Sequence, residues 1–498
     1  MCRLASLFLL LFAIVLPAQA KEPRWIGPLV ESAQSKTFAP IVLAGTRENA
    51  ALKAAGYVQE EWLIEGAANI YHENADGSLQ VRSADVPYVT QLVIVRPRDP
   101  RKFNGIVQMG FAHPQFANGN WGRIDTLVLR SGMAYAKLVI GGDPGTRQRS
   151  TTQWPVATPL LYKWYDPSRY AAFSWPQDDG VRWDVIGQAA SFLRSGSHGG
   201  PLAGLKVRGL YVSGWSFLGS LQRSFINFGF HDRYRRTDGG PVIDGYLIGI
   251  SAGAVAAGNV PLNSVDPVKE RGRDMLRVID SPVIELTSEM EAITNIYPMR
   301  AESDGVRGGH RIYELGGVSH SDSGVEGQAT PARAQLAARG HPGIEREVTC
   351  SMAFSDVPMR DVAQAALVNL DTWVRGGKAP PRASRLQVAE GTKNYNRDGF
   401  GNPIGGIRAA QLDVPLVRYG VPDLAECGGK SPGRKLNRLP LDRATLMARY
   451  PGGSRHYLAQ FDARADALVR QRWLLPADAA VQKMEARAFA RLAFKVVK

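Results

Sequence analysis

The chain contains little cysteine, and no cysteine stands in a pattern that binds metal. Among 498 residues there are three: Cys2, Cys350 and Cys427. Neither Cys350 nor Cys427 has a second cysteine or a histidine at the short spacing of zinc ligands. The sequence therefore predicts no metal site. The chemistry considered below requires no metal or organic cofactor.

Long hydrophobic runs are also lacking, except at the N-terminus. Arg3 precedes an apolar run of about 13 residues, Leu4 to Leu16, and Ala18-Gln19-Ala20 ends it in a small-x-small pattern. This run is short for a membrane span, which needs roughly 18 apolar residues, and is typical of a signal peptide. We expect residues 1–20 to be removed and the mature protein to be exported, periplasmic or secreted, with no stable membrane insertion.

Export predicts how the cysteines pair. Cys2 leaves with the signal peptide, so Cys350 and Cys427 remain in an oxidising compartment. We expect them to form a disulfide bond that closes a long loop. The chain-entropy model gives such a bond a contribution of about 4 kcal/mol to the free energy of unfolding.

Clustered positive charge is lacking as well, although the formal net charge is +14. Lys and Arg are scattered, with no run of five and no basic stripe interleaved with aromatic residues. We therefore expect no nucleic-acid partner. A basic surface of this kind favours acidic substrates or an anionic envelope through long-range attraction. The oligomeric state cannot be read from the sequence.

The chain shows no internal repeat or low-complexity segment. Its pattern of apolar and polar residues changes twice and divides it into three parts. Residues 21–99 alternate apolar and polar residues and predict a β-rich N-terminal part. Residues 100–330 alternate strand and helix patterns, which indicates a mostly parallel sheet with helices on both faces. Residues 331–498 are mostly helical, and we expect this extension to pack over the sheet edge. The fold class is α/β.

The most informative segment is a strand that turns on a serine into a helix. Leu210 to Gly214 reads as a buried strand, Ser216 follows, and Leu221, Phe225 and Phe228 then recur at helical spacing. This is the nucleophile elbow of an α/β-hydrolase, with Ser216 as the nucleophile. It departs from G-x-S-x-G because Leu218 stands where a second small residue is expected, and we expect that side chain to crowd the strand–helix contact.

A serine nucleophile needs a base and a carboxylate that orients it. His320 lies five residues past the predicted strand 311–315, in a glycine-containing loop where such a base belongs. Two carboxylates, Glu289 and Glu291, end the preceding strand. We favour Glu291 as the acid and Glu289 as a loop anchor, with Asp244 a more remote alternative.

The oxyanion donors are expected from two backbone segments. One is the amide of Phe217, which follows the nucleophile, and the other is an amide from the segment Gly110 to Ala112, with Phe111 or Ala112 favoured, at the end of an earlier strand. His113, in the same loop, and Trp215 and Leu218, around the elbow, are the residues we expect to contact substrate.

At the level of ordered motifs the chain resembles the bacterial, often exported "alpha/beta hydrolase domain" proteins. The matching segments span nearly the whole mature chain: 104–107, 164–170, 183–188, 244–246, 288–291, 313–320, 373–381 and 398–408. The resemblance implies an α/β-hydrolase fold and a serine hydrolase with Ser216, an acid near Glu291, and His320. Where the family's elbow resembles G-x-S-Q-S-G, this chain has Phe217 and Leu218, which indicates a more apolar site. Arg408 is a candidate contact for a substrate carboxylate.

Two functions follow from these residues. The first is an exported serine hydrolase that cleaves carboxylic esters or amides, small or polymeric, through an acyl-enzyme on Ser216. The alternative is a non-catalytic binding or scaffold protein on a degenerate hydrolase fold, which the unusual Leu218 suggests.

Overall fold

The fold is described from a computed structural model. It describes residues 23–114, 119–141, 158–196, 199–251, 260–266, 274–292, 299–320, 331–341, 351, 353–392, 394–420, 425–427 and 436–495. The predicted signal peptide lies outside these residues.

One large sheet dominates the molecule. Its nine strands lie in the order β1-β2-β3-β5-β4-β6-β7-β8-β9, and β10 and β11 form a separate two-stranded sheet. The strand bounds are β1 Arg24–Ile26, β2 Tyr57–Glu73, β3 Leu79–Pro97, β4 Ile106–Phe111, β5 Ala134–Leu138, β6 Gly209–Trp215, β7 Gly245–Gly249, β8 Val283–Ser288, β9 His310–Leu315, β10 Val417–Gly420 and β11 Asn437–Pro440.

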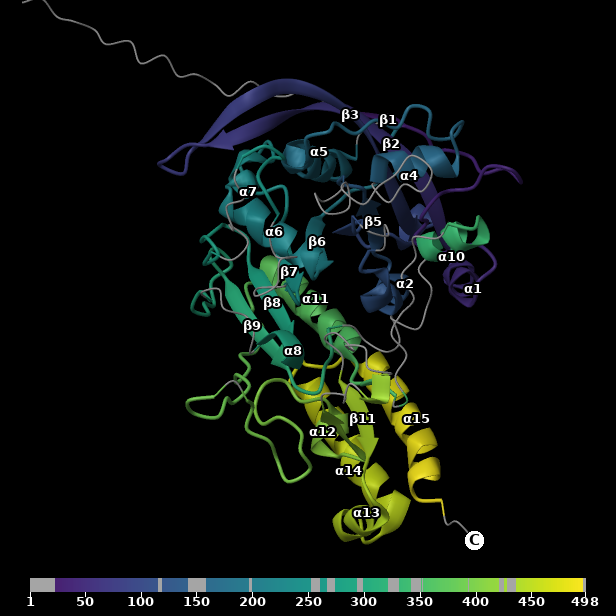
Figure 1. The fold of residues 1–498 in the computed structure, drawn as a ribbon, viewed down its shortest axis with the longest axis vertical. Coiled ribbons are helices and arrows are strands. Elements are labelled where there is room, and N and C mark those ends of the chain that lie inside the picture. Colours follow the sequence, from purple (N-terminus) through teal and green to yellow (C-terminus); the bar gives the residue numbers. More distant parts are fainter. Residues whose placement is uncertain are drawn as a thin grey trace, which may run out of the picture.

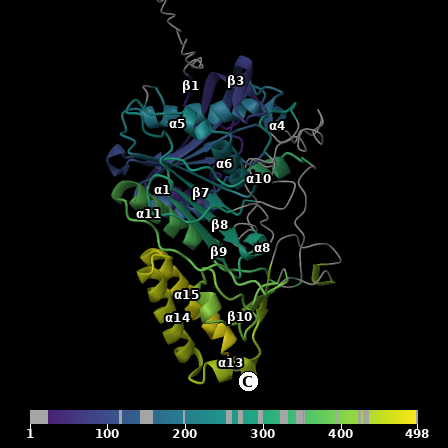
Figure 2. The ribbon, with the colours of Figure 1, turned by 90° about the vertical axis from the view of Figure 1, so that its left-hand side faces the viewer.

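The helices cover both faces of this sheet and extend beyond one edge (Figures 1 and 2). Their bounds are α1 Arg47–Ala54, α2 Asp125–Ser131, α4 Thr158–Tyr165, α5 Arg182–Ser195, α6 Phe217–Asn227, α7 Phe230–Arg233, α8 Glu289–Ala292, α10 Pro331–Ala338, α11 Met359–Gly376, α12 Ala410–Asp413, α13 Arg443–Arg449, α14 Gly453–Arg470 and α15 Pro476–Ala493.

The strand order shows an α/β-hydrolase sheet. Strands β5, β4, β6, β7, β8 and β9 run parallel, and β2 and β3 join them as an antiparallel hairpin. Parallel strands place their carboxyl ends at one edge, so the residues that follow β4, β6, β8 and β9 gather there. The predicted mostly parallel sheet with helices on both faces is confirmed.

Two apolar layers hold the helices to the sheet. On one face α5 and α6 pack through residues such as Leu193, Leu221 and Phe225. On the other, α1, α2 and α11 pack through Leu52, Val128 and their neighbours. The central strands are buried along their whole length, because a parallel sheet covered on both faces needs apolar residues on each side.

The N-terminal strands are longer than the sequence pattern predicts. Short alternating segments between residues 62 and 82 belong to two strands of 17 and 19 residues. The register of the pair shifts near Ala68 and Ile70, which interrupts the alternation without ending the strands. Gly66 lets the ring of Tyr88 approach, since an added Cβ would lie 2.8 Å from its hydroxyl oxygen.

The C-terminal extension begins as part of the core and ends as a separate layer. Helix α11 packs on β7 and β8, and Ile407 forms a parallel bridge with Leu315 of the edge strand β9. Helices α12 to α15 build a third apolar cluster beyond that edge, with Tyr457 and Phe461 at its centre. In Figure 1 this lobe lies at the opposite end of the molecule from β1–β3.

Candidate active site

Ser216 occupies a strained turn between β6 and α6. Its backbone has φ 58° and ψ −122°, a conformation that non-glycine residues rarely adopt. Strain of this kind persists only where the surroundings hold it, and it concentrates at functional sites. The Ser216 amide donates to the carbonyl of Gly249 in β7 at 3.0 Å, which fixes the turn to the neighbouring strand.

Two glycines allow the chain to turn this tightly. A Cβ on Gly214 would lie 2.8 Å from the Cβ and carbonyl oxygen of Leu218. A Cβ on Gly219 would lie 2.6 Å from the carbonyl oxygen of Gly249. The elbow therefore uses Gly214 against its own helix and Gly219 against β7.

Leu218 does not crowd the strand–helix contact as the sequence suggested. It is buried in the apolar layer beneath α6 and α5 and is only 3% exposed. Its Cβ fits because Gly214 has no side chain, and the glycine that approaches β7 stands one position later, at Gly219. Leu218 is thus a packing residue, and its burial leaves it little surface for contact with substrate.

His320 and Glu291 meet at the carboxyl ends of β9 and β8. The Nδ1 atom of His320 lies 2.5 Å from Oε1 of Glu291, whose side chain is 1% exposed, whereas that of His320 is 24% exposed. The hydroxyl of Ser288, the last residue of β8, donates to the other carboxylate oxygen, Oε2. A carboxylate at Nδ1 favours the tautomer with the proton on Nδ1, in which Nε2 is the basic nitrogen.

Glu289 points elsewhere, although it stands only two residues from Glu291. Its Oε2 accepts from the backbone amide of Gly317 at 2.7 Å, and its Oε1 accepts from Arg397 at 2.7 Å. The hydroxyl of Tyr395 donates to the Glu289 carbonyl oxygen at 2.8 Å. Glu289 therefore joins the acid loop, the histidine loop and the C-terminal extension.

The C-terminal extension also binds the histidine loop through hydrogen bonds. Ser355 donates to the Gly317 carbonyl oxygen at 2.5 Å, and the amide of Leu436 donates to the Ser319 hydroxyl at 2.8 Å. Gly317 has φ 72°, and a Cβ there would lie 3.0 Å from Leu412. The position of His320 thus depends on Ser355 and Leu436, which lie far beyond it in the C-terminal extension.

The expected oxyanion donors are only partly compatible with the structure. Phe217 is the first residue of α6, so its amide has no acceptor within the helix. Ala112 is wrong as a donor, because its amide donates to the Leu138 carbonyl oxygen at 2.8 Å and belongs to the sheet. Phe111 is the last residue of β4 and lies in register with Leu138.

A buried polar network fixes the segment that returns after β4. The Ser213 hydroxyl in β6 contacts Nδ2 of Asn120 and, at 2.7 Å, Nε2 of Gln108. Tyr135 of β5 donates to Oδ1 of Asn120 at 2.7 Å. Gly110 leaves room for this, since a Cβ there would lie 2.4 Å from Asn120 Oδ1. Asn120 therefore ties the chain around the oxyanion side to the nucleophile strand.

The two aromatic residues expected at the substrate site have different surroundings. The ring of His113 lies 5.7 Å from that of Phe217 in an edge-to-face contact, next to the elbow. Trp215 instead points into the core, where Nε1 donates to the sulfur of Met359 and Arg123 lies over the ring. Trp215 is therefore excluded from substrate contact by its burial.

Other polar candidates are engaged in structural ion pairs. Asp244 lies before β7, at the edge away from Ser216, and pairs with Arg194 at 2.5 Å. Arg408 is bound by Asp398 at 2.7 Å and Asp413 at 2.5 Å. Neither the remote acid candidate nor the candidate carboxylate contact is available for those roles.

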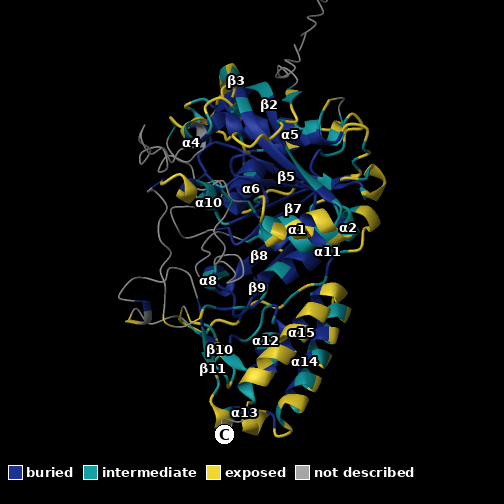
Figure 3. Cartoon of the chain, turned by 90° about the vertical axis from the view of Figure 1, so that its right-hand side faces the viewer, coloured by how far each residue is buried: buried dark blue, intermediate teal, exposed yellow. Residues whose placement is uncertain are grey.

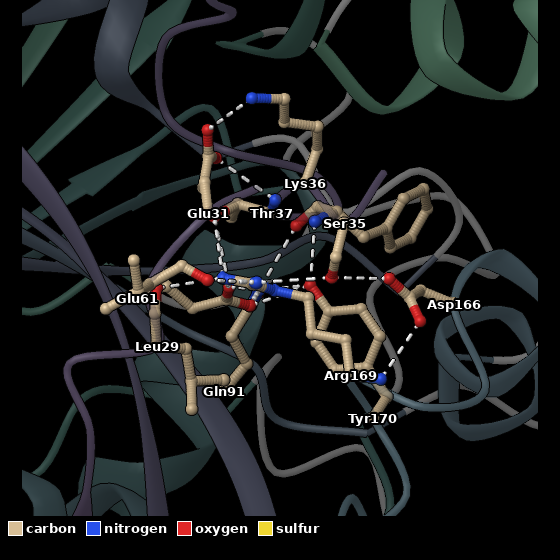
Figure 4. A network of polar contacts seen from close by, with 12 residues as sticks. Leu29, Glu31, Ser35, Lys36, Thr37, Glu61, Gln91, Asp166, Arg169 and Tyr170 are labelled. Atoms are coloured by element: carbon tan, nitrogen blue, oxygen red, sulfur yellow. Dashed lines mark hydrogen bonds and ion pairs between the residues drawn. The ribbon is translucent and has the colours of Figure 1, made fainter. Parts of the chain in front are cut away.

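The motif at residues 164–170 forms a buried clamp rather than part of the site (Figure 4). Arg169 donates to Glu61 at 2.5 and 2.8 Å and to the Leu29 carbonyl oxygen at 3.0 Å. Tyr170 donates to the same carboxylate at 2.7 Å. The clamp binds residues 29–40 to β2 and to the end of α4.

Lys137 lies beside this clamp on β5 and is fully buried. Its ammonium donates to the Ala39 carbonyl oxygen at 2.5 Å. Burial lowers the pKa of Lys137 to about 7, although the negative charge of Glu61 opposes this shift.

Sequence reasoning missed Ser288, Asn120, Ser355 and Arg397. Ser288 directly precedes the two glutamates, so its position beside the acid was a usable signal. The other three come from distant or irregular segments and carry no local pattern. Cys427 is buried and disulfide-bonded, whereas Cys350, its expected partner, lies outside the described residues. Among the described residues no group of His, Cys, Asp and Glu suits a metal ion, and none of the helices there is long and apolar enough to span a membrane.

Several solved structures resemble the chain weakly. A Pyrobaculum calidifontis esterase is 13% identical, over 59% of this chain and 87% of the esterase, with a TM-score of 0.27. Vibralactone cyclase is 11% identical, over 58% and 82%, with a TM-score of 0.31. The rice cell wall degrading esterase LipA from Xanthomonas oryzae is 11% identical, over 47% and 50%, with a TM-score of 0.22. At these sequence identities and TM-scores, the solved structures support no conclusion about the chemistry of this chain.

The family itself is shown by sequence. No curated protein matches the chain. A family profile described as "Alpha/beta hydrolase domain" matches residues 25–483, which is nearly the whole chain beyond the predicted signal peptide. The match agrees with the strand order and with the strained serine after β6. The chain belongs to this alpha/beta hydrolase domain family.

Proposed function

We propose that the protein is a serine hydrolase that cleaves carboxylic esters or amides through an acyl-enzyme on Ser216. The observation that carries this proposal is the pairing of His320 with the buried carboxylate of Glu291 at 2.5 Å, at the same sheet edge as the strained Ser216. A serine, a carboxylate and a histidine in this chain order are the components of nucleophilic acyl transfer in an α/β-hydrolase.

In the acylation step His320 acts as the general base. Its Nε2 takes the hydroxyl proton of Ser216 as the oxygen attacks the substrate carbonyl carbon, forming a tetrahedral oxyanion. The imidazolium then gives the same proton to the leaving alcohol or amine, and the C–O or C–N bond breaks. Glu291 stabilises the imidazolium and holds its orientation throughout.

Deacylation repeats these transfers with water. His320 takes a proton from water, the resulting hydroxide attacks the acyl carbon, and the proton returns to Ser216 as the acid product leaves. The amide of Phe217 at the start of α6 supports the oxyanion in both steps, and the partial positive charge of the helix N-terminus adds to it. A single oxyanion donor is typically worth about 10²–10³ in rate.

The proposal includes the compartment and the character of the substrate. Residues 1–20 have the pattern of a signal peptide, so we place the mature enzyme outside the cytoplasm. Phe217 and Leu218 replace the polar pair of the family's usual elbow. The buried Leu218 adds apolar packing beneath the elbow, and the Phe217–His113 contact gives its surroundings an aromatic character.

The test is intact-mass measurement of the purified protein after exposure to a fluorophosphonate, alongside Ser216→Ala. A single phosphonyl adduct on the natural chain and none on the variant is the expected result. Expression with the leader also reports cleavage, because a mature chain that starts at Lys21 has a defined mass.

Two controls make the result decisive. Ser220→Ala removes a buried hydroxyl four residues away on α6 and should leave labelling intact. Circular dichroism of each variant verifies folding. A folded natural chain that takes no adduct and hydrolyses no ester or amide would overturn the proposal in favour of a non-catalytic binding protein.

A further inference from the structure

Helix α15 has a second apolar face that points away from the protein. One face is buried through residues such as Ala479, Ala486 and Ala490. On the opposite side Val481 is 48% exposed, Met484 63% and Leu492 74%. Figure 3 shows exposed positions along helices α14 and α15. Polar residues normally occupy the outer face of a surface helix, so an apolar outer face indicates a surface that another molecule covers.

The exposed residues follow helical spacing and form one stripe. Val481, Met484, Ala488 and Leu492 recur at intervals of three and four residues, which places them along one side of the helix. We call these four residues the α15 stripe. Arg491, which is exposed, stands seven residues after Met484 and continues the same side of the helix, and the exposed Lys495 follows just beyond the helix end.

The lobe that carries the α15 stripe is strongly basic. Residues 443–498 contain eleven Lys or Arg and four Asp or Glu, a net charge of +7 and half of the +14 of the chain. Some of these cations are neutralised locally, for example Arg487 by Asp462 at 3.0 Å and Lys483 by Asp466 at 2.6 Å. Arg464 likewise pairs with Asp413 at 2.6 Å. The net charge of residues 443–498 nevertheless remains positive.

We infer that the α15 stripe docks on an anionic lipid surface. An apolar face bordered by basic residues is the pattern of a helix that lies in the headgroup region of a membrane, held by buried apolar area and by attraction to acidic lipids. The alternative occupant is a second copy of the chain. The charge disfavours it, because two lobes of +7 repel each other whereas an acidic lipid surface attracts both.

Glu485 borders the stripe and is the residue least suited to an acidic surface. It lies within electrostatic reach of Arg360, whose positive charge partly offsets the negative charge of Glu485. The docking is peripheral, and it does not depend on the proposed hydrolase activity.

The test is co-sedimentation of the full mature chain with vesicles of phosphatidylglycerol and phosphatidylcholine in equal parts, compared with phosphatidylcholine alone. We expect binding to the acidic vesicles at about 0.1 M salt and its loss at about 1 M, where the Debye length falls to about 3 Å. The double variant Met484→Ser/Leu492→Ser should reduce the partition coefficient by about tenfold or more.

The matched control is Val30→Ser/Val265→Ser. It removes two exposed valines, 84% and 72% exposed, from outside the C-terminal lobe, and should leave vesicle binding unchanged. Arg491→Gln/Lys495→Gln should weaken binding at low salt only.

Three results would overturn the inference. They are absence of binding by the natural chain, equal binding to neutral vesicles, and equal loss in the stripe and control variants. A concentration-dependent dimer in sedimentation velocity that the stripe variant abolishes would assign the surface to a second copy instead. Circular dichroism and fluorophosphonate labelling of the variants separate a folding defect from a docking defect.

Discussion

The nucleophile elbow and the acid–histidine arm are held in different ways. The elbow is built by residues 209–219 and closed by contacts to β7, the next strand of the sheet. Its conformation depends on Gly214, Gly219 and the Gly249 carbonyl oxygen. A short local sequence and one contact to the neighbouring strand therefore specify the position of Ser216.

The arm that carries Glu291 and His320 depends on distant parts of the chain. Arg397, Ser355 and the amide of Leu436 bind its two loops from the C-terminal extension. The comparison indicates that the extension is part of the active-site architecture. It also predicts that the two halves of the site respond differently to remote substitutions.

The largest expected effect separates the two glutamates of the arm. Glu291→Gln keeps the shape of the side chain but removes the charge that stabilises protonated His320, so we expect kcat/KM to fall about 10³–10⁴-fold. Glu289→Gln leaves that charge in place and disturbs only the contacts to Gly317 and Arg397, with an expected loss of about 10- to 100-fold. Steady-state hydrolysis of an activated ester measures both, and equal losses would contradict the separate roles.

The next effect tests the local character of the elbow. Gly219→Ala places a Cβ 2.6 Å from the Gly249 carbonyl oxygen, and we expect it to cost about 1–3 kcal/mol of unfolding free energy and most of the activity. Gly376→Ala, at the end of α11, is the matched control, since an added Cβ there meets nothing within 4 Å. Urea denaturation measures the free energy of unfolding of both variants. If Gly219→Ala were as stable and active as the natural chain, the elbow would accommodate the added Cβ by a backbone shift, which would contradict the prediction.

A smaller effect tests the remote support of the arm. Arg397→Met leaves the buried carboxylate of Glu289 with only the Gly317 amide, and we expect a loss of about 1 kcal/mol and a fall in kcat. The comparison variant is Arg382→Met. The Arg382 side chain is 51% exposed and pairs with Asp304 on the surface. This variant should change neither quantity. Identical behaviour of the two variants would remove Arg397 from the support of the arm.

The smallest effect on activity is expected at Lys137, which lies outside both halves. Because burial lowers its pKa from 10.5 to about 7, folding releases a proton between these values, and stability rises with pH across that range. The slope from this group is at most about 1.4 kcal/mol per pH unit.

Lys137→Met should flatten this rise between pH 7 and about 9 and leave kcat/KM unchanged. Urea denaturation at a series of pH values measures the slope. A variant with the slope of the natural chain would show that Lys137 does not titrate there.

The sequence was most informative where contacts are local. Strand and helix patterns predicted the parallel sheet, and the apolar run before Ser216 predicted β6 and α6. The histidine loop was also predicted, because His320 follows its strand at the carboxyl edge. The long hairpin β2–β3 was predicted only in pieces, since a shift in register near Ala68 breaks the alternation.

The sequence was least informative where a backbone amide or a side chain has more than one possible partner. It included Ala112 among the candidate oxyanion donors, but the amide of that residue completes the sheet with Leu138. It placed Trp215 at the substrate, but Trp215 packs on Met359 in the core. Neither outcome is encoded near these residues, because each depends on which strand or helix lies opposite.

By itself the sequence determined the fold class, the order of the candidate groups along the chain and the serine at the turn. These follow from periodicity and from glycine spacing, which act between near neighbours. Tertiary structure alone decided that Glu291 contacts His320 and that Glu289 binds Gly317. The sequence favoured Glu291 as the acid without excluding Glu289, because two carboxylates separated by one residue share the same local pattern. Only the loops folded against them from β9 and the C-terminal extension give each a different partner.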